Sequence, residues 1–320
     1  MKRICASLGV GLIIALAGLT QTGASSAAEA TPLNKLLRAD GSVITYYLDR
    51  YDHPRRSEKL LLVIQGSDCN SVRRIPAIPE HLAGVIPEAD VLTVEKYGID
   101  ENLPYEDEVD RADCPRDYLR HDSLSQRARD LDAVLTQVLR MNFYRQVVVI
   151  GGSEGAVVAH MLSAISPYVS ATIAFNGGGQ WFIDDVLHSV SADPMSARQK
   201  EHAEAGILDF VRQVRSQGCD DLIASDHGCL WWREVLSLDQ LSLLKKTTAP
   251  ALIIQSGRDK AVSPSAVLEL VARLHMSGSR NIYYRTYPEL DHRLSDLDGT
   301  SRMHEVASDM ALWLGKVLGE

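Results

Sequence analysis

The stretch VVVIGGSEGAVVAH, residues 147–160, joins an apolar run to a helix-like run through a turn that holds Ser153 between glycines. The run at 146–151 is almost continuously apolar, which is typical of a strand buried on both faces. The residues after Gly155 are apolar on nearly every side, which indicates a buried helix. A G-x-S-x-G match alone would occur by chance in about one chain in ten of this length, given roughly 7 % each of Gly and Ser. The order of strand, serine turn and helix therefore makes Ser153 a candidate nucleophile.

Strand-like and helix-like segments alternate along most of the chain. Strand patterns occur at 42–51, 60–66, 90–97, 146–151, 171–175, 251–256 and 281–287. Helical periodicity is clearest at 123–141 and recurs at 264–274 and 300–318. This alternation predicts an α/β fold with a mostly parallel central sheet flanked by helices. The first two strand patterns, joined by the polar stretch DHPRRSEK, are expected to form a hairpin.

One interval between strands is far longer than an ordinary connection. Residues 177–246 separate two strand patterns, and a structureless loop of that length is uncommon in a compact domain. Its helical stretch at 197–213 predicts a helical cap inserted between the later strands. The tryptophans there, Trp181, Trp231 and Trp232, are candidates for substrate binding, although such residues more often form the core of a cap. The predicted core is then 31–176 and 247–320.

Residues 1–30 have the layout of a secretory signal peptide. Two cations precede an apolar stretch of roughly fifteen residues, and small residues follow it up to Ala28 and Ala30. An uncleaved anchor is the alternative, but the apolar stretch is shorter than the ~20 residues that a spanning helix needs. The sequence therefore predicts a secreted or periplasmic protein with no stable membrane insertion after cleavage.

After cleavage, the mature chain would hold an even number of cysteines in an oxidising compartment, which predicts disulfides. The four candidates are Cys69, Cys114, Cys219 and Cys229. They permit three connectivities, and the sequence does not choose among them. Pairing Cys219 with Cys229 would close a short loop and leave the other two as the second pair. No C-x-x-C or paired-histidine spacing is present, so neither a metal nor another cofactor is expected.

The order of strand, serine turn and helix resembles the nucleophile elbow of serine hydrolases in the α/β-hydrolase superfamily, and the resemblance covers about residues 40–318. Those enzymes place an acid after a later strand and a histidine after the last one. Here ALIIQSGRDKAVSP, residues 251–264, supplies Asp259, and NIYYRTYPELDHRLSD, residues 281–296, supplies His292. The resemblance implies a triad in which His292 activates Ser153 and Asp259 orients His292. Three further acids beside His292 are weaker candidates, because an orienting carboxylate usually comes from another loop: Asp291, Asp296 and Asp298.

The resemblance also implies two backbone N–H groups that would bind the oxyanion formed during acyl transfer. One belongs to Glu154, directly after the nucleophile. The other belongs to Ser67, with Asp68 as the second choice, in the loop after the strand at 60–66. Many members of the superfamily have His-Gly in this loop, whereas this chain has Gln65-Gly66. The side chain of Glu154 is expected to face away from the pocket.

The implied function is a serine hydrolase that cleaves a carboxylic ester or related acyl bond through an acyl-enzyme on Ser153. A serine peptidase acting on short peptides and a non-catalytic binding protein on the same fold are the alternatives. The formal net charge of −9 disfavours nucleic acid as a partner, because nucleic acids are bound mainly through clustered Lys and Arg. A small-molecule ester or a short peptide is the expected ligand. The acidic run at 101–113 is expected to be a solvated loop, or else a contact for a cation.

Overall fold

The computed structural model describes residues 33–51, 56–107, 111–216 and 218–319, so the predicted signal peptide lies outside the described residues. One sheet has the strand order β1-β2-β4-β3-β5-β6-β9-β10. Its strands are β1 Leu33–Leu37, β2 Val43–Asp49, β3 Lys59–Ile64, β4 Asp90–Val94, β5 Gln146–Gly152, β6 Ala171–Phe175, β9 Ala251–Ser256 and β10 Ile282–Tyr287. All neighbours from β4 to β10 are parallel, whereas β2 is antiparallel to both β1 and β4. The predicted α/β fold with a mostly parallel sheet is confirmed.

The predicted hairpin between the first two strand patterns is wrong. β4 lies between β2 and β3 in the sheet, so these two strands are not neighbours. After Lys59, which begins the strand, the residues of β3 are apolar and buried on both faces, which suits an inner strand with a parallel partner on each side. β1 was not predicted from the sequence; its residues alternate between exposed and half-buried at the edge of the sheet.

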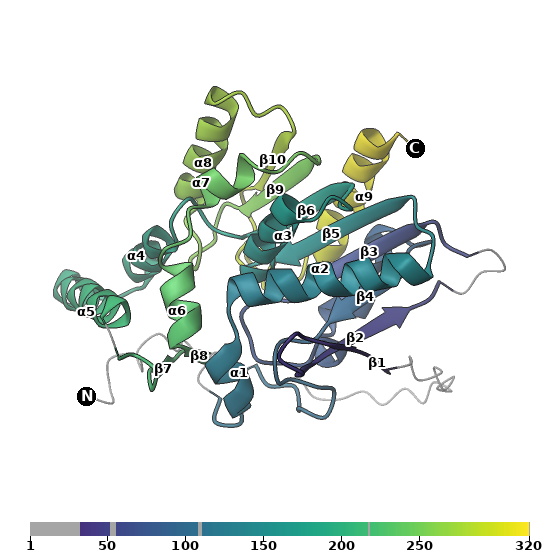
Figure 1. Ribbon diagram of the computed structural model, residues 1–320. Coiled ribbons are helices and arrows are strands. Elements are labelled where there is room, and N and C mark those ends of the chain that lie inside the picture. The colour runs from purple at the N-terminus through teal and green to yellow at the C-terminus, as the bar shows by residue number, and fades with distance from the viewer. Residues whose placement is uncertain (1–32, 52–55, 108–110, 217, 320) are drawn as a thin grey trace, which may run out of the picture.

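Helices cover both faces of the sheet (Figure 1). On one face lie α2, Leu124–Met141, and α3, Glu154–Ile165; on the other lie α9, Met303–Leu318, and the short segments η2, Ile78–Leu82, and η3, Ala83–Val85. Successive side chains of a strand point to opposite faces, so Leu60 and Leu62 of β3 pack toward α2 and α3. Leu61 and Val63 instead belong to the core beneath α9. Outside 177–246, the described part of the chain also forms η1, Val72–Arg74, α1, Arg116–His121, and α8, Pro264–Met276.

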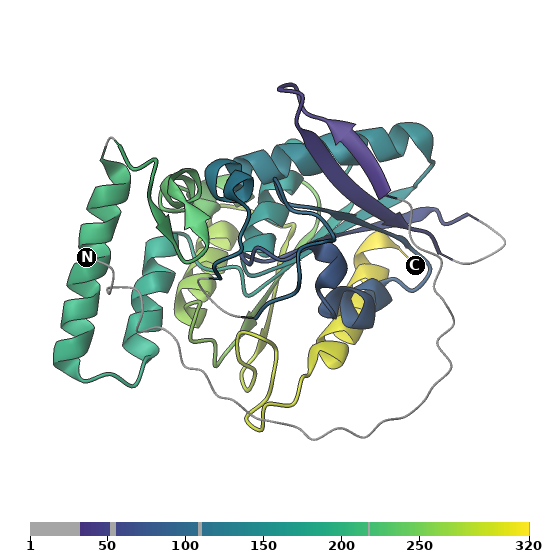
Figure 2. The same cartoon turned by 90° about the horizontal axis from the view of Figure 1, so that it is seen from below.

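We call residues 177–246 the insert. It contains α4, Phe182–Ala192; α5, Ala197–Arg215; a small pair of strands, β7, Ile223–Ala224, and β8, His227–Gly228; α6, Cys229–Val235; and α7, Gln240–Leu244. Figures 1 and 2 place α4 and α5 at one end of the molecule. By contrast, Trp231 and Val235 of α6 share a core with α2 and α3, and Leu241 of α7 packs with β9. The insert is therefore partly built into the main core, and its role as a cap stays a prediction.

Two disulfides select one of the three possible connectivities. Cys69 pairs with Cys114, which ties the loop after β3 to the segment before α1. Cys219 pairs with Cys229, which ties the segment after α5 to the start of α6. Among the helices that the structure describes, none is long and apolar enough to cross a membrane.

Candidate active site

Ser153 occupies a sharp turn between β5 and α3. Its backbone has φ 55° and ψ −127°, a conformation that non-glycine residues rarely adopt. A Cβ atom at Gly151 would overlap the backbone of Gly155, and one at Gly155 would overlap the carbonyl oxygen of Ile64. The two glycines thus let the strand and the helix approach each other closely enough to form the turn.

The structure brings the three predicted triad residues together. His292 Nε2 lies 3.2 Å from Ser153 Oγ, and His292 Nδ1 lies 2.8 Å from Asp259 Oδ2. The other carboxylate oxygen, Asp259 Oδ1, accepts hydrogen bonds from the backbone N–H groups of Ala261 at 2.9 Å and Val262 at 2.8 Å. Asp259 is buried, while the side chain of His292 is 28 % exposed. The histidine can therefore be oriented by a fixed acid and still meet a ligand from solvent.

Two positioning contacts were not found from the sequence. Asn176, just after β6 and at φ 51°, donates from Nδ2 to the carbonyl oxygen of His292 at 2.9 Å and to Ser256 Oγ at 3.1 Å. Its Oδ1 accepts the backbone N–H of Ser256 at 2.8 Å. From the insert, His188 Nε2 lies 2.9 Å from the carbonyl oxygen of Asp259. The only sequence signal for Asn176 is an amide residue followed by three glycines directly after a buried strand.

The loop after β3 lies against the serine turn. A Cβ atom built on Gly66 would be 3.7 Å from Ser153 Cβ, so the adjoining Ser67 also lies near the nucleophile. The carbonyl oxygen of Ser67 accepts a hydrogen bond from the hydroxyl of Tyr118 at 3.3 Å. The backbone N–H groups of Ser67 and Glu154 donate to no other residue that the structure describes. Their role as oxyanion donors stays a prediction.

The side chain of Glu154 points into the interior, which is the orientation expected from the sequence. Its Oε1 accepts a hydrogen bond from Arg127 Nη1 and lies 3.7 Å from Lys96 Nζ. Its Oε2 accepts a hydrogen bond from the indole N–H of Trp231 at 2.6 Å. Glu154 is therefore held on both sides by buried donors, and its side chain is only 5 % exposed.

The three candidate tryptophans lie in different surroundings. Trp231 is only 3 % exposed, so it is a core residue and not the wall of an open site, which corrects that candidate role. Trp232 is half-buried; it packs edge-on against Phe182 and Phe210 and donates its N–H to the carbonyl oxygen of Ala224 at 3.0 Å. Trp181 is 38 % exposed and borders a pocket.

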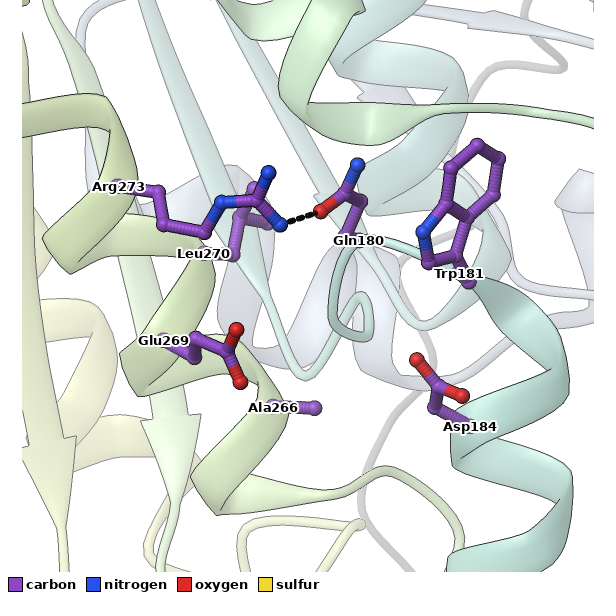
Figure 3. A pocket seen from close by; sticks show the side chains of 7 residues that line it. All are labelled: Gln180, Trp181, Asp184, Ala266, Glu269, Leu270 and Arg273. Carbon is purple, nitrogen blue, oxygen red and sulfur yellow. Dashed lines mark hydrogen bonds between the residues drawn. The ribbon is translucent and has the colours of Figure 1, made fainter. Parts of the chain in front are cut away.

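That pocket lies between the start of α4 and the face of α8 (Figure 3). It has a volume of about 90 Å³ and is lined by Gln180, Trp181, Asp184, Ala266, Glu269, Leu270 and Arg273. Figure 3 shows Trp181 and Asp184 facing the α8 side chains, and Arg273 donating a hydrogen bond to the side chain of Gln180. The lining includes no triad residue, so this pocket is separate from the serine turn. No cluster of metal-ligating side chains occurs among residues 33–51, 56–107, 111–216 and 218–319.

No protein-family model matches the chain, and no curated protein matches it. Solved structures do resemble it. Est1E from Butyrivibrio proteoclasticus is 14 % identical with a TM-score of 0.59, and the match covers 90 % of this chain and 99 % of that one. A puromycin-hydrolyzing peptidase of Mycobacterium tuberculosis is 14 % identical with a TM-score of 0.61, covering 90 % of this chain but 39 % of the peptidase. An esterase of Pyrococcus furiosus is 14 % identical with a TM-score of 0.54, covering 91 % and 92 %. Together with the strand order and the serine turn, these likenesses show that the chain has the α/β-hydrolase fold.

Proposed function

We propose that this protein is a serine hydrolase that cleaves a carboxylic ester or related acyl bond through an acyl-enzyme on Ser153. The observation that carries the proposal is the hydrogen-bonded series from Asp259 through His292 to Ser153, with the serine in a strained turn. A binding protein would have no need for this series, because a nucleophile, a base and an acid are useful together only when a proton must move.

In the proposed mechanism, the neutral imidazole of His292 removes the hydroxyl proton of Ser153 as the oxygen attacks the acyl carbon. The carbonyl oxygen of the substrate becomes an oxyanion, and the N–H groups of Glu154 and Ser67 stabilise its charge. The carboxylate of Asp259 stabilises the imidazolium. His292 then gives its proton to the leaving group, and the acyl-enzyme forms. In the second half-reaction a water, deprotonated by His292, attacks the acyl carbon. The bond between that carbon and Ser153 Oγ then breaks, His292 returns the proton to Ser153, and the acid is released.

Two of the similar structures favour an ester as the substrate. One is named an esterase. Est1E has also been solved with ferulic acid bound, at 15 % identity to this chain, and a carboxylic acid is the product that cleavage of an ester releases. Cleavage of short peptides stays the alternative, because another similar structure is a puromycin-hydrolyzing peptidase. This chain spans about two fifths of that protein. The two disulfides support a secreted or periplasmic location, because such bonds persist in oxidising compartments.

A fluorophosphonate probe tests the catalytic proposal. It should label the folded protein, and Ser153→Ala should abolish labelling, while Ser308→Ala in α9 should leave it unchanged. Absence of labelling in the folded wild-type protein would contradict the proposal. Comparing p-nitrophenyl acyl esters with aminoacyl and dipeptidyl arylamides then separates the two substrates. A larger kcat/KM for an arylamide than for every ester tested would favour the peptidase.

A further inference from the structure

The two proposed oxyanion donors belong to separate parts of the fold. Ser67 is in the loop after β3, and Glu154 begins α3. An oxyanion site works only when its donors are held about 3 Å from the same point. We propose that Lys96, Arg127 and Trp231 are positioning residues that fix the spacing of these two segments. This proposal rests on the function proposed above.

Lys96 connects the two segments directly. It follows β4, and its side chain is 1 % exposed. Its ammonium donates a hydrogen bond to the carbonyl oxygen of Asp68 at 2.7 Å and lies 3.7 Å from Glu154 Oε1. A single buried cation therefore binds the residue after Ser67 and the residue after the nucleophile.

Arg127 forms a second connection at the other end of the loop. It lies on α2 with a side chain that is 6 % exposed. Its Nη2 donates to the carbonyl oxygen of Gln65 at 2.9 Å, and its Nη1 donates to Glu154 Oε1. The carbonyls held by Arg127 and Lys96 thus flank the Gly66–Ser67 peptide, whose N–H is the proposed donor. Because a peptide unit is planar, holding the adjoining Gln65–Gly66 unit on one side and the Asp68–Cys69 unit, two units along, on the other restricts how this one can turn.

The insert reaches the same two segments through Trp231. Its indole N–H donates to Glu154 Oε2 at 2.6 Å, so the carboxylate cannot turn away from the two cations. The indole also stacks on His227, with ring centroids 3.7 Å apart. His227 Nδ1 lies 3.1 Å from the hydroxyl of Tyr118, which donates to the carbonyl oxygen of Ser67. The insert therefore supports both donor segments, one through Glu154 and one through Tyr118.

A role in stability alone does not explain this cluster. Burial lowers the pKa of Lys96, and the negative charge of the nearby Glu154 opposes this shift only in part. Near it, Asp122 has both carboxylate oxygens buried with no hydrogen-bond partner among the described residues, and burial raises its pKa to about 6. Buried ion pairs are often no more stabilising than apolar side chains of the same size. Lys96 and Arg127 donate directed hydrogen bonds to the backbone of the loop after β3. Apolar side chains could not supply these bonds.

The test compares variants that remove the contacts of one positioning residue at a time with matched controls elsewhere. Trp231→Phe removes the N–H that binds Glu154, and Trp232→Phe is its control, because the Trp232 N–H binds Ala224 instead. Lys96→Met removes the ammonium, and Lys59→Met, at the start of β3, is its control. Each variant is assayed for kcat and KM on p-nitrophenyl acetate, for inhibition by a trifluoromethyl ketone that forms a tetrahedral adduct, and for thermal unfolding.

Loss of a whole oxyanion donor lowers kcat by about 10²- to 10³-fold, so a displaced donor should lower it by about 10- to 100-fold. We expect this loss in Lys96→Met and, at the lower end, in Trp231→Phe, with KM within about twofold and the ketone inhibition constant raised by the same factor as kcat falls. The controls should stay within about twofold of wild type.

Folded variants with wild-type kcat, or with unchanged ketone affinity, would overturn the positioning role. If Lys96→Met does not fold, Trp231→Phe decides the question alone. A wild-type protein that neither binds the fluorophosphonate nor turns over any ester refutes the proposed function itself. A wild-type protein that does both, beside variants that behave like it, refutes only the positioning role.

Discussion

Replacing Asn176 tests how the histidine loop is held. The side chain is 1 % exposed and makes three hydrogen bonds, two to Ser256 and one to the carbonyl oxygen of His292. Each such bond contributes about 1 kcal/mol net. The residue also sits at φ 51°, which costs an alanine roughly 1 to 2 kcal/mol and a glycine almost nothing. Asn176→Ala should therefore lower the free energy of unfolding by about 4 kcal/mol, and Asn176→Gly by about 3 kcal/mol.

The same pair of variants separates backbone strain from positioning. Both lose the bond to the His292 carbonyl, so both should lower kcat by about 10- to 100-fold, because a catalytic group displaced by 1 Å can lose that much rate. Urea denaturation gives the stability, and ester turnover on folded protein gives kcat. The reasoning is refuted if Asn176→Gly restores wild-type kcat, or if Asn176→Ala costs less than about 1 kcal/mol.

Three further predictions concern the acid, a buried carboxyl and a disulfide. Asp259→Asn should lower kcat by about 10⁴-fold with little change in stability, and kcat within tenfold of wild type would contradict its role. Burial raises the pKa of Asp122 to about 6, so the folded protein keeps a proton that the unfolded chain releases. Stability from this group is complete below about pH 4 and is lost as the pH rises through 6. About one pKa unit of that range lies above pH 5, so urea denaturation at pH 5 and pH 8 should show a fall that Asp122→Asn reduces by about 1.4 kcal/mol, and an equal fall in both proteins would exclude this assignment. The Cys69–Cys114 bond closes a separation of 45 residues, so replacing both cysteines by serine should cost about 4 kcal/mol by chain entropy, and an unchanged thermal midpoint would show that the bond does not form.

The sequence predicted the elements with strong periodicity well. The helix expected at 123–141 is observed as α2, Leu124–Met141, because its apolar spacing is regular and Ser123 accepts a hydrogen bond from the N–H of Gln126 at its start. The strand patterns at 171–175 and 251–256 match β6 and β9. Strand order was harder, because the residues of β3 show that it is an inner strand but not which neighbour it has. The insertion of β4 beside it depends on contacts between distant parts of the chain.

Some residues of the candidate site could likewise be predicted from the sequence, and others could not. The triad residues stand in fixed chain order after strand patterns, so their positions could be inferred one by one. Lys96 could not, because it looks like the polar end of a strand, and its contacts with Asp68 and Glu154 depend on how three loops meet. The sequence allowed either a core or a substrate role for Trp231, and only the buried contact with Glu154 distinguishes them.

The most direct test of the central claim is to trap the acyl-enzyme. Folded protein mixed with p-nitrophenyl acetate and quenched within milliseconds should release a burst of p-nitrophenol close to one equivalent, with the acetyl group on the peptide that contains Ser153. Ser153→Ala should show neither the burst nor the acetylated peptide. An acetyl group found on another residue, or steady turnover that survives in Ser153→Ala, would contradict the account.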